Sequence, residues 1–185
     1  MLKKLSYKLT TRLLCKGVIE YDDFEIYQYG LEQIFTNIIN VLTLIVMGVI
    51  FDNLVCGLIF AAAFMELRAY AGGYHASTPV RCYILTTVVI IVVLLLMKYV
   101  EVSYFFELGL IVISGFVIIL LSPVESVNKP LDDIERKVYR KKAILIWCVE
   151  IVIAIWCVFL KFNEVAISIV MAHVVLGASQ LAGLK

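Results

Sequence analysis

One short polar segment of the chain holds a histidine and a cysteine that are seven residues apart, His75 and Cys82. Thr78 and Pro79 between them are typical of a helix start, with threonine as the N-cap and proline as the first helical residue. Because a helix N-terminus carries partial positive charge, it stabilises a thiolate in the first turn. These residue types predict nucleophilic catalysis, with Cys82 as the nucleophile and His75 as the general base.

The spacing of these two residues sets a condition on this chemistry. On one continuous helix, His75 and Cys82 would be about 10 Å apart along the axis, whereas proton transfer needs about 3 Å. Gly72, Gly73 and Pro79 interrupt such a helix, so we expect a bent loop that folds His75 back over the helix start. The alternative interpretation is a solvated loop histidine and an ordinary core cysteine.

Three ionisable residues lie within or beside apolar segments, namely Glu66, Glu150 and His173. Such groups are costly in a bilayer and are usually paired or functional. Glu66 could orient His75 or pair with Arg68, and Glu150 could pair with His173. The same three residues support an alternative function, a membrane transporter or exporter of a peptide or small solute. A third hypothesis is a non-catalytic membrane subunit whose loop docks a partner.

Metal and disulfide chemistry are not expected. The loop offers one histidine and one cysteine, whereas a metal site needs three or four ligands. The five cysteines are scattered and include no CxxC pair, so free thiols are expected. No cofactor is predicted.

The composition excludes several classes of protein. Hydrophobic residues make up 63% of the 185 residues and charged residues 17%, with a mean hydropathy of +0.99. Soluble globular proteins contain about 45–50% apolar residues. A water-soluble enzyme, a disordered chain and a nucleic-acid-binding module are therefore poor interpretations. The long apolar runs predict an all-α fold that crosses a membrane several times.

Uncharged runs between charged residues predict about six transmembrane helices. They cover residues 33–51, 54–67, 83–97, 105–121, 143–160 and 165–184. Several are shorter than the ~20 residues that span a bilayer, and interfacial aromatic, lysine and arginine side chains would complete them. The shortest, 54–67, either crosses fully or enters and returns.

The distribution of basic residues predicts the orientation. With six spans, all of the 16 lysines and arginines except Lys98 and Lys161 fall on the side that holds both termini. Because basic residues concentrate in cytoplasmic loops, both termini and the loop with His75 and Cys82 are expected in the cytoplasm.

The N-terminal sixteen residues have a pattern of their own. Leucines at positions 2, 5, 9 and 13 alternate with basic residues, which predicts an amphipathic helix. This helix could lie on the anionic inner leaflet, pack against the cytoplasmic ends of the bundle, or do both. We expect one integral-membrane domain over residues 1–185, with an amphipathic segment at 1–30 and a transmembrane bundle at 31–185.

Residues 68–76 read RxxxGGxHA and are followed by Cys82. This motif resembles the signature of the AgrB family (accessory gene regulator protein B), membrane peptidases of bacterial quorum sensing. The chain length, the six predicted spans and the basic N-terminal helix also match the family. The resemblance therefore covers nearly the whole chain.

The resemblance implies a cysteine endopeptidase in the bacterial plasma membrane, with its active site at the cytoplasmic face. It would cleave the C-terminal part of an AgrD-like propeptide through an acyl-enzyme on Cys82 and promote closure of a thiolactone or lactone ring. His75 would be the general base, and Arg68, Gly72 and Gly73 would shape the site or stabilise the oxyanion. The propeptide, membrane lipid and a second copy of the chain are the expected partners, and nucleic acid is not.

The propeptide of such enzymes has an acidic tail, and basic side chains are candidates to bind it. They are Arg81, Arg136, Arg140, Lys141 and Lys142. The alternative interpretation of the last four is anchoring of the bundle on the cytoplasmic side.

Overall fold

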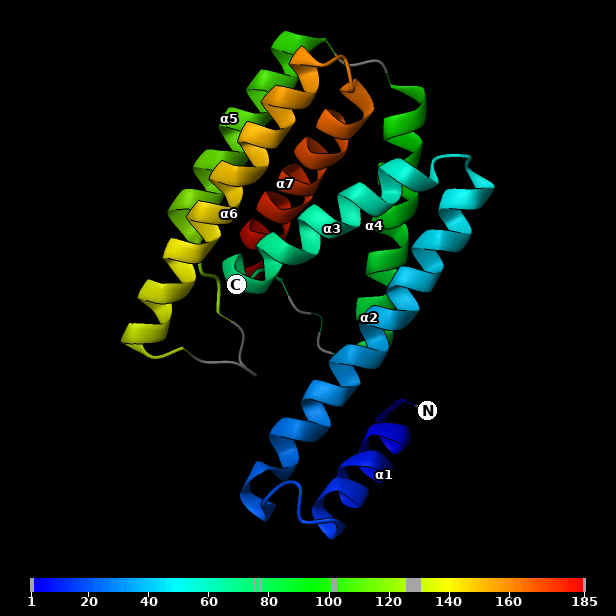
Figure 1. The fold of residues 1–185 in the computed structure, drawn as a ribbon, viewed down its shortest axis with the longest axis vertical. Helices are drawn as coiled ribbons and strands as arrows, with labels where there is room; N and C mark the ends of the chain where they lie inside the picture. Colours follow the sequence, from blue (N-terminus) through cyan, green and yellow to red (C-terminus); the bar gives the residue numbers. More distant parts are fainter. Residues whose placement is uncertain (1, 75, 77, 101–102, 126–130, 185) are drawn as a thin grey trace. The chain divides into compact units, whose positions relative to one another are not determined.

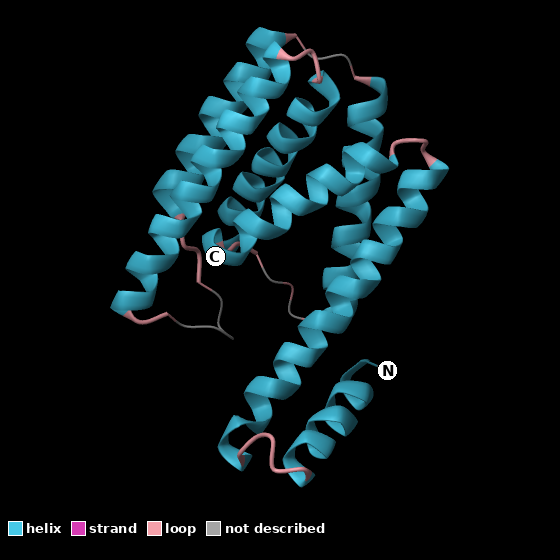
Figure 2. Cartoon of the chain, in the orientation of Figure 1, coloured by secondary structure: helices cyan, strands magenta, loops and turns pink. Residues whose placement is uncertain are grey.

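A computed structural model describes residues 2–74, 76, 78–100, 103–125 and 131–184. The helices, shown in Figure 1, are α1 (Leu2–Cys15), the 3-10 turn η1 (Tyr21–Asp23), α2 (Phe24–Ile50), α3 (Leu54–Ala71), α4 (Pro79–Tyr99), α5 (Tyr104–Leu121), α6 (Asp133–Phe159) and α7 (Asn163–Gly183). Within these ranges no strand forms (Figure 2), and β pairing is limited to an isolated parallel bridge between Gly72 and Val124. The predicted all-α class is confirmed.

The chain divides into two compact units, Met1–Thr43 and Leu44–Lys185. In the first unit, α1 packs on the beginning of α2. The buried Ser6 hydroxyl donates to the Glu32 carboxylate at 3.2 Å, and the rings of Tyr7 and Phe24 meet edge to face at 5.5 Å. The lysines of α1 are exposed. The amphipathic helix predicted at the N-terminus therefore forms and packs on α2, while its placement on a membrane stays a prediction.

In the second unit, α7 lies at the centre and contacts α3, α4, α5 and α6. Half of its most apolar window is buried, against one third or less in the other helices of spanning length. Small residues line these contacts and let the helices approach closely. The main cluster consists of Phe60, Ala63, Val93, Ala154, Ala166, Ile169 and Ala172.

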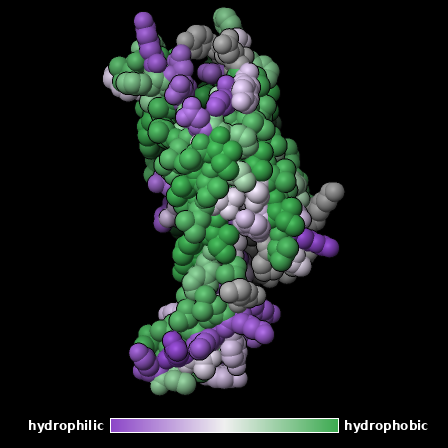
Figure 3. Space-filling model, turned by 90° about the vertical axis from the view of Figure 1, so that its right-hand side faces the viewer, coloured by the Kyte–Doolittle hydropathy of each residue, from purple (hydrophilic) through white to green (hydrophobic). Residues whose placement is uncertain are grey.

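Five helices are long and apolar enough to cross a membrane, and α5 offers a shorter apolar stretch, Phe105–Leu121. Figure 3 shows hydrophobic side chains over much of the visible surface of the long helices. Each of the six predicted segments falls on a separate helix to within a residue. The molecule is thus a polytopic membrane-type helical protein, while the number of crossings stays a prediction.

Several helices extend beyond the apolar runs that predicted them, among them α2, α3 and α6. Helix α3 continues to Ala71 through Glu66 and Arg68, because charged residues interrupt an apolar run but leave the backbone hydrogen bonds intact. Helix α2 begins at Phe24 rather than near residue 33, and α6 begins at Asp133 rather than near residue 143. The start of α6 is fixed by a capping box, in which the Asp132 carboxylate accepts from the Glu135 backbone N–H and the Glu135 carboxylate accepts from that of Asp132.

Candidate active site

Cys82 lies in the first turn of α4. The Thr78 hydroxyl caps this helix by accepting from the backbone N–H of Arg81 at 3.3 Å, and the backbone N–H of Cys82 donates to the Thr78 carbonyl at 3.0 Å. The predicted helix start at Pro79 is confirmed. The Cys82 side chain is half-buried, so it combines partial shelter from water with access for a reacting group.

The helical structure is interrupted before Cys82, because α3 ends at Ala71 and α4 begins at Pro79. His75 and Ser77 lie outside the residues that the structure describes. The contact between His75 and Cys82 therefore stays a prediction.

Gly72 and Gly73 let the chain leave α3 in a conformation that other residues rarely adopt, with φ of +72° and +140°. A β-carbon on Gly72 would collide with the carbonyl group of Val124. A β-carbon on Gly73 would approach the Ser179 hydroxyl to 2.8 Å. The two glycines thus allow the loop to lie directly against the start of the α5–α6 connection and the end of α7.

Arg68 points from the end of α3 toward this loop. Its Nη1 donates to the Ser179 hydroxyl at 2.8 Å, and its Nη2 donates to the Tyr74 carbonyl at 2.6 Å. Its guanidinium also lies 5.5 Å from the centre of the Phe64 ring. An electrostatic interaction also connects Arg68 with Cys82. The structure therefore brings together two of the predicted site elements, namely the arginine and the glycine loop.

Glu66 was a candidate partner for either Arg68 or His75. Its side chain is exposed, and the guanidinium of Arg68 is bound by Ser179 and the Tyr74 carbonyl instead. A role for Glu66 in orienting His75 stays a prediction.

Several residues that sequence reasoning missed hold the loop in place. The backbone N–H of Tyr74 donates to the Ser179 carbonyl at 2.9 Å. The Gln180 side-chain amide donates to the Ala71 carbonyl at 3.0 Å and to the Ser122 hydroxyl at 2.9 Å. The backbone N–H of Val124 donates to the same Ala71 carbonyl at 2.9 Å. Two segments distant in sequence, the end of α7 and residues 122–124, thus form the support of the loop.

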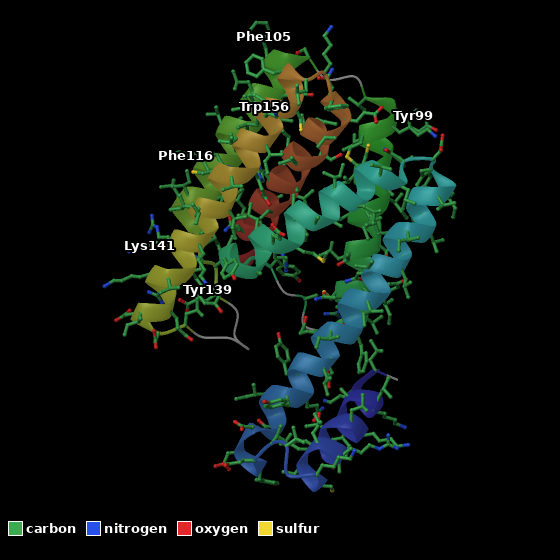
Figure 4. The ribbon with its side chains drawn as sticks, in the orientation of Figure 1. Tyr99, Phe105, Phe116, Tyr139, Lys141 and Trp156 are labelled. Atoms are coloured by element: carbon green, nitrogen blue, oxygen red, sulfur yellow. The ribbon has the colours of Figure 1, made fainter. Side chains whose placement is uncertain are left out.

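The predicted substrate-binding cations are all exposed. Arg136 pairs with Glu125 at 2.6 Å, Arg140 donates to the Ile119 carbonyl at 3.3 Å, and the ammonium of Lys142 lies 4.9 Å from the centre of the Tyr70 ring. Lys141 points away from the bundle (Figure 4). Arg136, Arg140 and Lys142 are thus among the cations that have partners within the chain, and contact of the five with a substrate stays a prediction.

The predicted pairing of Glu150 with His173 is confirmed. The carboxylate Oε2 lies 2.7 Å from the imidazole Nε2, and the two side chains are 8% and 0% exposed. The pair joins α6 to α7 inside the bundle. The pairing therefore gives a structural role to Glu150 and His173, two of the three ionisable residues that the transport hypothesis uses. The third, Glu66, is exposed.

The sequence of this chain is similar to a known protein family. The family model described as accessory gene regulator B matches residues 3–180, a range that includes the whole loop, Cys82 and most of α7. The chain belongs to the AgrB family. An AgrB-like protein of Clostridium perfringens strain SM101 is 25% identical over 189 residues, which cover 97% of this chain and 88% of the relative. The accessory gene regulator protein B of Staphylococcus carnosus is 25% identical over 154 residues, which cover 82% of this chain and 78% of the relative.

No solved structure matches the chain significantly. The AgrB resemblance that the RxxxGGxHA motif and Cys82 indicate is confirmed by the family match. The family is described as accessory gene regulator B, and five described helices of this chain are long and apolar enough to cross a membrane.

Proposed function

We propose that this AgrB-family chain is a membrane cysteine endopeptidase of quorum sensing that cleaves the C-terminal part of an AgrD-like propeptide. The observation that supports this most is the position of Cys82, half-buried in the capped first turn of α4, directly after the loop that Arg68 holds. The thiolate is the nucleophilic form of cysteine, and a helix N-terminus is a position that favours a thiolate.

In the first step, the Cys82 sulfur attacks the carbonyl carbon of the scissile peptide bond. His75 accepts the thiol proton and then gives it to the leaving amine, so the products are a thioester on Cys82 and a free C-terminal fragment. Backbone N–H groups of the Gly72–Gly73 loop or of the first turn of α4 would stabilise the oxyanion.

In the second step, a thiol of the bound propeptide attacks the thioester. A new thioester closes the ring, the Cys82 thiol is restored, and the bond types before and after are the same, so little free energy is lost. A serine hydroxyl in the substrate would give a lactone instead. Competing hydrolysis requires water, and a site under a loop at the membrane surface would limit its access.

The proposed site is the cytoplasmic face of the bacterial plasma membrane. The end of α3, the start of α4, the start of α6 and the end of α7 lie at one end of the second unit (Figure 1), and this end carries Arg68, Arg81 and the basic residues of α6. Basic residues concentrate on the cytoplasmic side. An acidic propeptide tail would meet these cations there, and a homodimer is the proposed assembly.

The test uses the purified protein in lipid with the small propeptide expected to be encoded nearby. Wild type should show a covalent acyl adduct by intact mass and should shorten the propeptide, whereas Cys82→Ser should do neither. Cys148→Ser is the matched control, because Cys148 is an exposed thiol on α6, away from the loop, and its loss should leave cleavage unchanged. Cleavage that persists in Cys82→Ser, or no cleavage by wild type, would contradict the proposal.

A further inference from the structure

Ser179, near the end of α7, contacts two parts of the candidate site at once. Its hydroxyl oxygen accepts from Arg68 Nη1 at 2.8 Å and from the backbone N–H of Tyr74 at 3.1 Å. Its own carbonyl accepts from the same Tyr74 N–H at 2.9 Å. Because a hydroxyl oxygen has two lone pairs, this arrangement uses the full acceptor capacity of the side chain.

The surroundings of Ser179 leave little room for another arrangement. Gly73 lies so close that a β-carbon there would be 2.8 Å from the hydroxyl and 3.1 Å from Arg68 Nη1. Further along α7, a β-carbon on Gly183 would come within 3.1 Å of the Tyr74 nitrogen. The last turns of α7 thus fit the loop closely, and Ser179 supplies the polar contact within that fit.

Arg68 is held at two points. Nη1 is fixed by Ser179 and Nη2 by the Tyr74 carbonyl at 2.6 Å, and Tyr74 is itself bound to Ser179. Loss of the hydroxyl would therefore remove one tether of the guanidinium directly and weaken the other through the backbone of Tyr74. The Tyr74 backbone leads into α4, whose first turn holds Cys82, and Arg68 interacts electrostatically with Cys82, so a guanidinium and a loop that are free to move would no longer keep a fixed position toward the thiol.

We propose that Ser179 is a positioning residue for the reaction at Cys82, because its hydroxyl fixes the guanidinium of Arg68 and the backbone of Tyr74 beside the start of α4. Ser179 acts through Arg68. The assignment of a reaction to Cys82 rests on the proposed function, whereas the effect of Ser179 on the reactivity of the Cys82 thiol does not.

The first experiment measures thiol reactivity without any propeptide. In protein whose other four cysteines are replaced by alanine, the rate of Cys82 alkylation by iodoacetamide is followed by intact mass in lipid. Ser179→Ala should slow alkylation about three- to tenfold. This range is expected when a hydrogen bond to a charged group is lost and only part of its free energy changes the reactivity of the Cys82 thiol. Ser179→Thr keeps a hydroxyl and should restore most of the rate.

The matched control is Ser114→Ala. Ser114 is also a helical serine and is buried, but its hydroxyl donates to carbonyls of its own helix, those of Leu110 at 2.6 Å and Ile111 at 3.3 Å. Its loss should leave the alkylation rate unchanged. The thermal midpoints of the two alanine variants should agree within a few degrees, which separates positioning from unfolding.

The deciding comparison uses an Arg68→Gln background. If Ser179 acts through Arg68, Ser179→Ala should have no further effect on alkylation there, because mutations of coupled residues are not additive. An undiminished effect in that background would overturn the proposal. Equal alkylation rates for wild type and Ser179→Ala would overturn it as well.

The same variants are then tested on the propeptide. Ser179→Ala should lower kcat several-fold with KM nearly unchanged, since the hydroxyl positions the reacting group and does not bind the substrate. A rise in KM alone would overturn the positioning role. If wild type cleaves nothing while the coupling of Ser179, Arg68 and Cys82 alkylation holds, the proposed function fails and the positioning role stands.

Discussion

At Gly72 the backbone conformation and the close approach of another segment both require the absence of a side chain. Its φ is +72°, and a β-carbon would collide with the Val124 carbonyl group. Gly17 has nearly the same φ, +67°, but has no neighbouring atom within 4 Å of the corresponding position. The two glycines therefore separate the cost of the left-handed backbone from the cost of crowding.

Alanine at each position gives the first prediction. Gly17→Ala should lose about 1–2 kcal/mol of stability, the cost of a left-handed non-glycine residue, and should keep propeptide cleavage within about twofold. Gly72→Ala should lower cleavage more than about tenfold, because the loop must move off Val124 and shifts of about 1 Å in a site cost that much. Initial cleavage rates and thermal midpoints are the measurements, and equal losses of activity in the two variants would contradict the argument.

The residues of the site divide into those that sequence could reveal and those it could not. Cys82 and its cap are local, because Thr78 and Pro79 define a helix start within a few positions. Ser179 lies 111 residues from Arg68, and no spacing rule connects them. The available signal was a run of small and polar residues in the last predicted span, at positions 177–183, where close backbone approach is common. Such a stretch indicates that another segment packs closely against it, but it does not indicate which segment.

Among the helices, α3 shows most clearly how charge and helix length are separate properties. The predicted second span, residues 54–67, is short because the charged residues Glu66 and Arg68 mark its end. The helix nevertheless continues to Ala71, since Glu66 is exposed and Arg68 finds two hydrogen-bond partners beyond the helix. Hydropathy therefore located the six apolar helices correctly, while their ends were set by caps and by distant contacts such as that of Gln180 with Ala71.

The pair of α6 and α7 is joined by Glu150 and His173, and this contact gives the second prediction. Glu150→Ala leaves a buried imidazole without its 2.7 Å partner and should cost about 2 kcal/mol. Interhelical hydrogen bonds in membrane proteins contribute about 0.6 kcal/mol, and unpaired buried ions cost about 3–5 kcal/mol. Glu150→Gln keeps a hydrogen-bonding group and should cost less than half as much, as measured by denaturant unfolding in mixed micelles.

The same variants address the transport hypothesis. Because the pair lies on α6 and α7 within the bundle and not among the contacts of the glycine loop, Glu150→Gln should leave propeptide cleavage within about twofold of wild type. A folded Glu150→Gln protein that has lost its activity would indicate that the ionisable residues of the bundle take part in function, as the transport hypothesis requires.

In the second unit, most of the exposed basic side chains lie at one end of the helices, and a set of strongly exposed aromatic side chains lies at the other. The aromatic set is at the end of α4, the start of α5, the end of α6 and the start of α7, and it consists of Tyr99, Phe105, Phe106, Trp156, Phe159 and Phe162. Figure 4 shows Tyr99, Phe105 and Trp156 at one end and Lys141 toward the other. Aromatic side chains favour the membrane–water interface and basic ones the cytoplasmic side. The end that holds Arg68 and Cys82 is therefore expected in the cytoplasm.

The two tryptophans test this placement, because both are on α6 but in different surroundings. Trp156 is 65% exposed, whereas the ring of Trp147 packs beside His173, with a centroid distance of 6.4 Å. In vesicles that contain brominated lipid, the fluorescence of a Trp147→Phe variant should be quenched at least about twofold more than that of a Trp156→Phe variant. For Trp156, bromine atoms near the headgroup should quench more than bromine atoms near the end of the acyl chain, because tryptophan prefers the interface. Stronger quenching of Trp147, or the greatest quenching of Trp156 at the bilayer centre, would place α6 at a different depth and contradict the interfacial position of the aromatic set.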